Sequence, residues 1–204
     1  MKHDQRVILI GGSSNVGKTA VAGEISDRLG WCQRSTDYLA RHPGRPWQPK
    51  PLTVPVHVAE HYLGLSTEAL IESVLAHYQN VWPLIENLIR EYAEGQDAGL
   101  VLEGSAVWPA NVSSLRLPQV SAIWLTASDE LFRTRILRES QYAFADQRGK
   151  QMVDKFLERT LSFNRLMIKE VLRLDLPYLV VGQGVAVETV ADLCLSQMRS
   201  PCST

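Results

Sequence analysis

One segment near the N-terminus matches the phosphate-binding pattern G-x-x-x-x-G-K-[ST] at every fixed position. Its glycines let backbone N–H groups approach a phosphate without a Cβ in the way, and the helix that follows adds a positive dipole end. The lysine places its charge on the β- and γ-phosphates, and the next hydroxyl ligates Mg²⁺. We therefore predict a site for ATP and Mg²⁺; the alternative is a glycine-rich turn that binds nothing. The segment consists of Gly12, Ser13, Ser14, Asn15, Val16, Gly17, Lys18 and Thr19.

Two acidic residues come at the ends of expected strands. Asp37 follows a short strand that ends near residues 36–37, and Glu103 ends a buried strand over Gly99–Glu103. Ligands of open parallel sheets bind beyond the carboxyl ends of the strands, so both carboxylates are placed to meet one. We predict that Asp37 accepts the proton of an acceptor hydroxyl, although a turn or cap role is the alternative. We predict that Glu103 serves the metal with Thr19 or binds the acceptor; its alternative is a buried structural role.

Arginines gather on the helix that follows the fourth strand and beyond it. Charge spreads over three oxygens in the transition state of phosphoryl transfer, and guanidinium groups match those oxygens. We predict that Arg135 and Arg138 clamp the transferred group, within a lid of about residues 138–151. Arg148 flanks the polar loop of that lid. For Arg133 and Arg159 we favour a solvated, salt-bridged helix face.

Two further patterns are weaker. Gly182 and Gln183 follow the fifth strand, where backbone groups could pack against adenine or form an ordinary turn. His57 and His61 match H-x-x-E-H, a zinc signature of metalloproteases. No third ligand stands out beside them, so we favour chance or acceptor binding over zinc.

A proline-rich excursion separates the second strand from the next helix. Residues 41–55 hold half of the chain's ten prolines, which excludes a strand or a continuous helix there. We interpret residues 38–65 as an acceptor-binding flap, and the alternative is a rigid connector. The basic side chains of Arg41, Arg45 and Lys50 favour an anionic acceptor.

The apolar pattern predicts strands alternating with helices, which is typical of a parallel sheet. We expect an α/β fold, a three-layer α/β/α sandwich with a five-stranded parallel sheet and a small lid, in one domain over residues 1–204. Pro83 is expected to kink or restart the helix that contains it. The other expected strands are Val7–Ile10, Val120–Leu125 and Pro177–Val181, and the helices are Lys18–Leu29, one from Ser66 to Gly95, one after Ser128, Met152–Leu174 and one from Val187.

Composition excludes several classes of protein. The chain of 204 residues has 21 Lys and Arg against 22 Asp and Glu, which excludes a strongly basic nucleic-acid binder and a polybasic membrane-surface protein. No apolar run is long enough to span a bilayer. The scattered cysteines Cys32, Cys194 and Cys202 have no metal-ligand spacing and indicate reduced thiols in the cytoplasm. No oligomeric state follows from these patterns.

The order of these features resembles small-molecule P-loop kinases such as shikimate, gluconate and adenylate kinases. Gly11–Lys18 and Asp37 are similar to the corresponding parts of chloramphenicol phosphotransferase, and Leu102–Gly104 is similar to 2-phosphoglycerate kinase-type sequences. The resemblance implies ATP-dependent transfer of a γ-phosphate to a hydroxyl of a small molecule, with Asp37 as base. The resemblance concerns the order of motifs and secondary-structure elements, and it extends over nearly the whole chain. Two alternatives are a nucleoside or nucleotide kinase and a regulatory ATP-binding module with slow hydrolysis.

Overall fold

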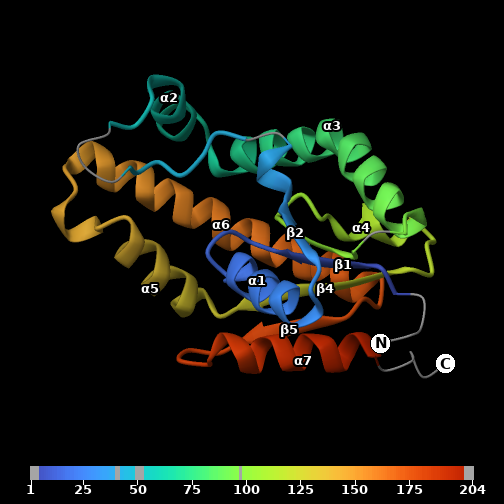
Figure 1. The fold of residues 1–204 in the computed structure, drawn as a ribbon. Coiled ribbons are helices and arrows are strands. Elements are labelled where there is room, and N and C mark those ends of the chain that lie inside the picture. The colour runs from blue at the N-terminus through green and yellow to red at the C-terminus, as the bar shows by residue number, and fades with distance from the viewer. Residues whose placement is uncertain (1–4, 40–41, 49–52, 97, 200–204) are drawn as a thin grey trace.

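A five-stranded parallel sheet forms the centre of the molecule (Figure 1). The structure is a computed structural model that describes residues 5–39, 42–48, 53–96 and 98–199. The strand order is β2-β3-β1-β4-β5, and every neighbouring pair is parallel. The predicted α/β/α fold with this sheet is therefore confirmed. The strands are β1 (Val7–Gly12), β2 (Cys32–Ser35), β3 (Leu100–Glu103), β4 (Val120–Ala127) and β5 (Tyr178–Val181).

Helices cover both faces of the sheet. On one face α1 (Lys18–Leu29) packs against α7 (Val187–Arg199), and on the other α3 (Thr67–Glu94) packs against α6 (Gln147–Arg173). α2 (Val56–Gly64) and α5 (Asp129–Glu139) also pack on α6, toward the carboxyl ends of the strands (Figure 1). The short elements are α4 (Pro109–Ser113) and the 3-10 turns η1 (Thr36–Tyr38) and η2 (Tyr142–Phe144).

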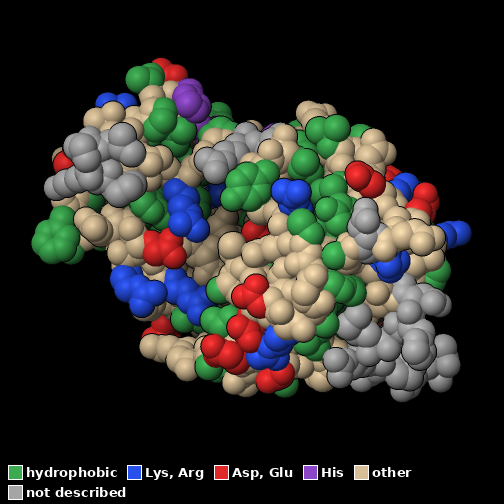
Figure 2. Space-filling model, in the orientation of Figure 1, with side chains coloured by type: hydrophobic (Ala, Val, Ile, Leu, Met, Phe, Trp, Pro, Cys, Tyr) green, Lys and Arg blue, Asp and Glu red, His purple; other side chains and the backbone are tan. Residues whose placement is uncertain are grey.

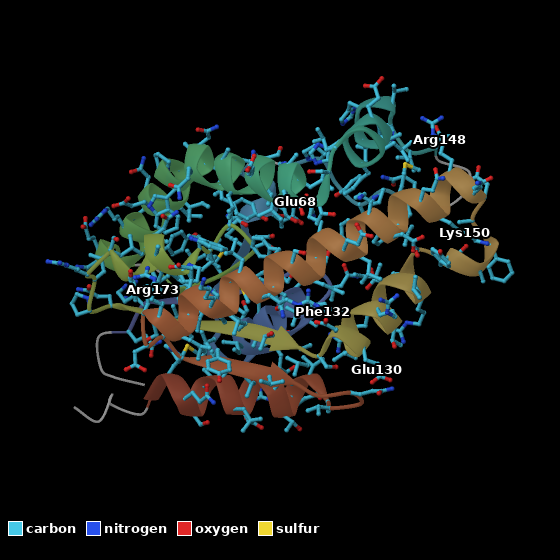
Figure 3. The ribbon with its side chains drawn as sticks, turned by 180° about the vertical axis from the view of Figure 1, so that it is seen from behind. Glu68, Glu130, Phe132, Arg148, Lys150 and Arg173 are labelled. Carbon is cyan, nitrogen blue, oxygen red and sulfur yellow. The ribbon has the colours of Figure 1, made fainter. Side chains whose placement is uncertain are left out.

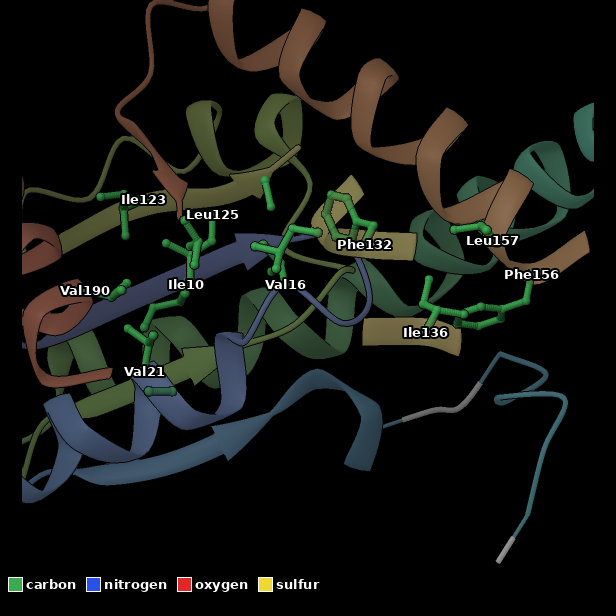
Figure 4. Packing of buried hydrophobic residues seen from close by; sticks show 14 of the residues in the cluster. Ile10, Val16, Val21, Ile123, Leu125, Phe132, Ile136, Phe156, Leu157 and Val190 are labelled. Carbon is green, nitrogen blue, oxygen red and sulfur yellow. The ribbon is translucent and has the colours of Figure 1, made fainter. Parts of the chain in front are cut away.

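Alternation along β1 divides the core into two apolar layers. Ile8 and Ile10 point toward α1 and α7, whereas Val7 and Leu9 point toward α3 and α6, and all four side chains are fully buried. A strand buried on both faces must be apolar throughout, which explains its continuous β-branched and Leu sequence. Figure 4 shows the first layer continuing from the sheet to the helices around the carboxyl ends of the strands.

Capping residues set several helix ends where the sequence placed them. Gly30 ends α1 in the left-handed conformation, with φ 62°. The Ser66 and Ser128 side chains accept hydrogen bonds from the backbone N–H groups of Ala69 and Leu131. These serines satisfy donors that the first turn of a helix leaves free.

Two long helices depart from the expected boundaries. α3 is one continuous helix that runs through Pro83, so it does not restart there. α6 begins at Gln147 instead of Met152, because the Asp146 side chain caps it by accepting a hydrogen bond from the Gly149 N–H at 2.6 Å. The loop of the predicted lid is therefore shorter: residues 140–146 lie between α5 and α6, and they include η2.

The predicted flap contains a helix that the sequence did not reveal. α2 follows Pro55 at once and has only nine residues, so its periodicity is too brief to recognise. Residues 42–48 form neither helix nor strand, as expected. Arg45 ties them to the end of α5 through an ion pair with Glu139, Nη1 to Oε2 2.9 Å. Arg41 and Lys50 lie outside the described residues. Among the helices that the structure describes, none has the length and apolar character to cross a bilayer.

Candidate active site

The loop between β1 and α1 forms the predicted phosphate cradle. Gly17 caps α1 with φ 106°, in the left-handed region that favours glycine. Lys18 is buried, and its Nζ donates to the Ser13 carbonyl at 2.9 Å and to the Ser105 hydroxyl at 3.4 Å. The amine of Lys18 and the backbone N–H groups of this loop are donors of the kind that a nucleotide phosphate requires.

Opposing effects act on the pKa of Lys18. Burial lowers it from the ordinary value, whereas the negative charges of Glu103 and Asp37 raise it. The positive charge of Arg45 is a smaller lowering cause. Both carboxylates are therefore near enough to stabilise the charged amine, which places the three groups in one electrostatic unit.

Thr19 and Glu103 meet at the edge of the cradle. The Thr19 hydroxyl donates to Glu103 Oε1 at 3.1 Å, and Glu103 is 3% exposed. Glu103 stands at the end of β3, in register with Ile10 of β1 and Ser35 of β2. A hydroxyl and a carboxylate are hard oxygen donors of the kind that Mg²⁺ prefers, with phosphates and water completing the shell. The pair fits Mg²⁺.

Asp37 lies on η1, just beyond the carboxyl end of β2. The cap of this turn is Ser35, whose Oγ accepts the Asp37 N–H at 3.4 Å. The Asp37 carboxylate is exposed, lines the cleft and has no hydrogen bond to any described residue. It is thus free to meet a ligand, and the capping role belongs to its neighbour.

The arginines of α5 divide into two groups. Arg135 Nη1 donates to the carbonyls of Asn15 and Val16 at 3.1 and 2.7 Å, which ties α5 to the cradle. Arg138 also lines the cleft. Arg133 is exposed and is not among the described residues that line it.

Other predicted residues stand apart from the cleft. Arg148 and Lys150 lie at the outer end of α6 (Figure 3), and Arg148 is exposed. Gly182 and Gln183 are exposed in the turn after β5, and of that turn it is Val185 that lines the cleft.

The phosphate-binding loop, Asp37, Glu103 and the α5 arginines Arg135 and Arg138 line a cleft of about 820 Å³ beyond the carboxyl ends of the strands. Figure 2 shows basic side chains gathered over α5, beside the hollow on this face. We call the part around the β1–α1 loop the phosphate end. We call the part that is lined by His42, Trp47, His77, Tyr78, Phe156 and Arg159 the aromatic end.

The sequence interpretation of Arg159 was wrong. Its side chain is 9% exposed and lines the cleft, so it does not belong to a solvated helix face. The guanidinium lies 4.9 Å from the centroid of the Phe156 ring and 5.7 Å from that of Tyr62. A signal was present: Arg159 falls three residues after Phe156 and four before Phe163, on the apolar stripe of α6.

The histidines of the aromatic end were also missed. His42 contacts His61 and His77, with ring centroids 4.9 and 5.4 Å apart, and its Nε2 lies 3.1 Å from the Ser73 hydroxyl. Burial and the charge of Arg159 lower the pKa of both His42 and His61, that of His42 to about 3. These rings come from residues 42–48, α2 and α3, so no local pattern joins them.

The zinc signature does not form a metal site. α2 carries His57 on its exposed surface, whereas His61 packs against His42 and Tyr62. Over the described part of the chain, no three His, Cys, Asp or Glu side chains are arranged to hold a metal ion.

A second cavity of about 880 Å³ lies at the opposite edge of the sheet. It is lined by the amino-terminal end of β4, by Leu115 and by Tyr178, and by none of the predicted site residues. Because ligands of open parallel sheets bind at the carboxyl ends of the strands, the first cleft is the candidate active site.

Comparison with known proteins finds similarity of fold but no match of sequence. No protein-family model and no curated protein sequence matches this chain. Solved structures do: a sugar kinase from Janibacter sp. HTCC2649 has 18% identity and a TM-score of 0.56, and covers 96% of each chain. Deoxyadenosine kinase from M. mycoides has 15% identity and a TM-score of 0.50, covering 95% of this chain and 99% of its own.

A shikimate kinase from Acinetobacter baumannii gives the same result, with 14% identity, a TM-score of 0.50 and 96% of each chain covered. All three neighbours are kinases of small molecules or nucleosides. At these identities the similarity concerns the arrangement of the chain, from the first strand to the last helix. The chain therefore has the fold of the P-loop small-molecule kinases.

Proposed function

We propose that the protein is an ATP-dependent kinase that transfers the γ-phosphate to a hydroxyl of a small molecule. One observation carries the proposal: Lys18, the Thr19–Glu103 pair and Asp37 surround the same cleft. A cation that binds phosphate, two side chains that can ligate Mg²⁺ and a free carboxylate are the parts that phosphoryl transfer to an alcohol needs.

Each group has a distinct task in this proposal. Lys18 and the loop N–H groups bind the β- and γ-phosphates, and Thr19 and Glu103 hold Mg²⁺, which neutralises phosphate charge when bound. Arg138 clamps the transferred group, and Arg135 positions the loop through the carbonyls of Asn15 and Val16.

In this proposal Asp37 accepts the proton of the acceptor hydroxyl. The acceptor oxygen forms a bond to the γ-phosphorus while the bond from that phosphorus to the β,γ-bridging oxygen breaks. The proton goes to the carboxylate, and ADP leaves with the electron pair. The free carboxylate of Asp37, with no hydrogen bond to a described residue, supports this role.

We further propose that residues 1–204 act as one kinase domain in which residues 138–151 close over the nucleotide. The Arg45–Glu139 ion pair supports coupled movement of residues 42–48 with the end of α5. Hydrogen exchange of residues 140–150 with and without nucleotide measures that closure; equal protection in both states would contradict it. The free thiols of Cys32 and Cys194 fit the reducing cytoplasm.

An acceptor-dependence assay tests the function. ADP release with ATP and Mg²⁺ is measured across a panel of sugars, hydroxy acids, nucleosides and aminoglycosides, with ³¹P NMR to detect the phosphorylated product. We expect ADP release to rise with one chemical class and a phosphate ester to form. Slow phosphate release that no acceptor changes would instead favour the regulatory module, and ester formation only on nucleosides would favour a nucleoside kinase.

A further inference from the structure

Arg159 is a buried positive charge that no described carboxylate neutralises. Its side chain is more than nine-tenths buried, and no ion pair joins it to a described residue. Of the carboxylates around the cleft, Glu139 pairs with Arg45, Glu103 accepts a hydrogen bond from Thr19, and Asp37 makes no ion pair with Arg159. A buried charge without a counterion costs free energy that a folded protein normally avoids.

The neighbours of Arg159 are uncharged. Two aromatic rings face the guanidinium, those of Phe156 and Tyr62. His42 and His61 are neutral at physiological pH, because burial and the charge of Arg159 lower their pKa. A second cation, Arg45, lies 5.8 Å from the centroid of the Trp47 ring but is paired with Glu139. Among the described residues of the aromatic end, Arg159 is therefore a positive charge without a counterion.

Tyr78 connects this charge to the reacting groups. Its side chain lines the cleft, and burial raises its pKa to about 12, with smaller effects from the charges of Arg159 and Asp37 and from a hydrogen bond with Ser105. Ser105 also accepts from Lys18. The charges of Arg159 and Asp37 thus both act on the Tyr78 hydroxyl, and Ser105 connects that hydroxyl to Lys18.

We propose that Arg159 binds the carboxylate of the acceptor, so that the acceptor is a hydroxy acid whose hydroxyl faces Asp37. This rests on the kinase function proposed above. A guanidinium matches a carboxylate with two parallel N–H···O bonds, and binding would supply the counterion that the folded chain lacks. One unpaired guanidinium suits a single negative charge, whereas a phosphate monoester carries nearly two.

In this proposal the cation that binds the acceptor lies on α6, whereas two of the flap cations, Arg41 and Lys50, lie outside the described residues. Of the three flap cations that suggested an anionic acceptor, Arg45 is paired with Glu139. Arg159 was assigned to solvent from the sequence alone. Arg159 is next to Thr160, whose carbonyl accepts a hydrogen bond from the Ser13 hydroxyl at 3.1 Å, and it lines the same cleft as Asp37. One acceptor could therefore meet the guanidinium of Arg159 with its carboxylate and Asp37 with its hydroxyl.

The proposal is tested by the ratio of kcat/KM for an acid to kcat/KM for its matched amide. Glycerate, gluconate, quinate and 4-(hydroxymethyl)benzoate are each compared with their primary amides and with phosphate-bearing analogues, and kcat/KM is measured for every compound. We expect the wild-type protein to prefer the best acid over its amide by about 10- to 100-fold. Arg159→Gln should reduce that preference to near one, mainly through KM. The ratio does not depend on how much of the variant is folded.

Two variants control for structure. Arg159→Lys keeps the charge without the planar fork and should keep part of the preference. Arg165→Gln removes an exposed arginine of the same helix, paired with Asp129, and should leave the ratio unchanged. Wild-type preference for amides or phosphate esters, or an unchanged ratio in Arg159→Gln, would overturn the proposal while the kinase function stands.

A binding measurement separates the two proposals. Melting temperature is followed with the same acids, an unreactive ATP analogue and Mg²⁺. If no acceptor is phosphorylated but acids still stabilise the wild-type protein and not Arg159→Gln, the carboxylate site stands and the kinase function fails. If acids neither stabilise the protein nor accept phosphate, both proposals fail.

Discussion

The phosphate end and the aromatic end of the cleft are held in different ways. At the phosphate end, the side chains stand on or next to β1, β2 and β3, whose register fixes them, and Lys18 reaches the carbonyl of Ser13, five residues away. At the aromatic end, rings from α3, α6 and residues 42–48 meet, and His42 also contacts His61 of α2, so the rings come from different parts of the chain. The phosphate end thus consists largely of backbone groups, whereas the aromatic end consists of side chains.

We infer from this difference that the phosphate end binds the nucleotide phosphates, whereas the aromatic end determines which acceptor is bound. Backbone N–H groups recognise phosphate in the same way whatever the side chains are. An end built from side chains can change its acceptor by substitution without disturbing β1 or α1. We therefore expect changes at the phosphate end to abolish turnover, and changes at the aromatic end to alter specificity or stability.

Lys18→Ala has the largest expected effect. Turnover should fall by about a thousandfold and ATP affinity should fall strongly, because the amine contacts the transferring phosphate. The unliganded protein should be at least as stable as the wild type, since a buried charge is removed. Steady-state kinetics and thermal unfolding measure both, with Lys155→Ala, a half-buried lysine of α6 outside the cleft, as control. Turnover at the wild-type rate would contradict the kinase function.

Asp37→Asn should be the next largest. Asn keeps the shape of the side chain but cannot take a proton, so transfer should fall by about a hundredfold with ATP affinity preserved. Ser35 caps η1, so stability should not change. Asp146→Asn, at a true helix cap outside the cleft, is the matched control. Full activity in Asp37→Asn would show that the reaction needs no base at this position.

Glu103→Gln sharpens the metal assignment. Gln can still accept the hydrogen bond from Thr19, but it lacks the negative charge that attracts a cation. The Mg²⁺ concentration for half-maximal activity should rise by about tenfold. A titration of activity with Mg²⁺ at fixed ATP measures it. An unchanged Mg²⁺ dependence with a raised KM for the acceptor would show that Glu103 binds the acceptor and not the metal.

Arg138→Ala should reduce kcat by roughly tenfold and change ATP affinity less, because the clamp matters most as charge migrates. Arg133→Ala on the exposed side of the same helix is the control and should leave kcat unchanged. A variant that weakens ATP binding with kcat intact would make Arg138 a ground-state contact.

The same contrast explains how much the sequence could predict. The phosphate end follows from eight consecutive residues, and the sheet follows from apolar runs such as Val7–Ile10, which belong on both faces of a parallel sheet. Ser66, Ser128 and Gly30 set helix ends through local hydrogen bonds or a permitted φ. All these signals act over a few residues, so a single sequence contains them.

The aromatic end has no such local signal. His42 lies in a proline-rich segment, and its contacts with His61 and His77 arise only from tertiary packing. Arg159 lies on an apolar stripe, but charged residues are so seldom buried that the pattern favoured solvent. The side chains that we propose to select the acceptor therefore became visible only with the structure.

His42→Gln has the smallest expected effect and concerns stability. The pKa of His42 falls to about 3, through burial and the charges of Arg159 on α6, His61 on α2 and His77 on α3. The unfolded chain, with a pKa near 6.5, therefore binds a proton that the folded protein excludes between about pH 6.5 and 3. Stability should be full above pH 6.5 and should decline as pH falls through that window.

For one histidine the loss between pH 7.5 and pH 5 is about 1–2 kcal/mol in the free energy of unfolding. His42→Gln can keep a hydrogen bond to Ser73 and should remove most of that loss, as urea unfolding at the two pH values measures. His57→Gln, on the exposed surface of α2, is the matched control and should keep the wild-type pH dependence. An equal decline in His42→Gln would mean that His42 takes up its proton without unfolding. The aromatic end would then be open to water, which would also remove the reason to expect an unscreened charge on Arg159.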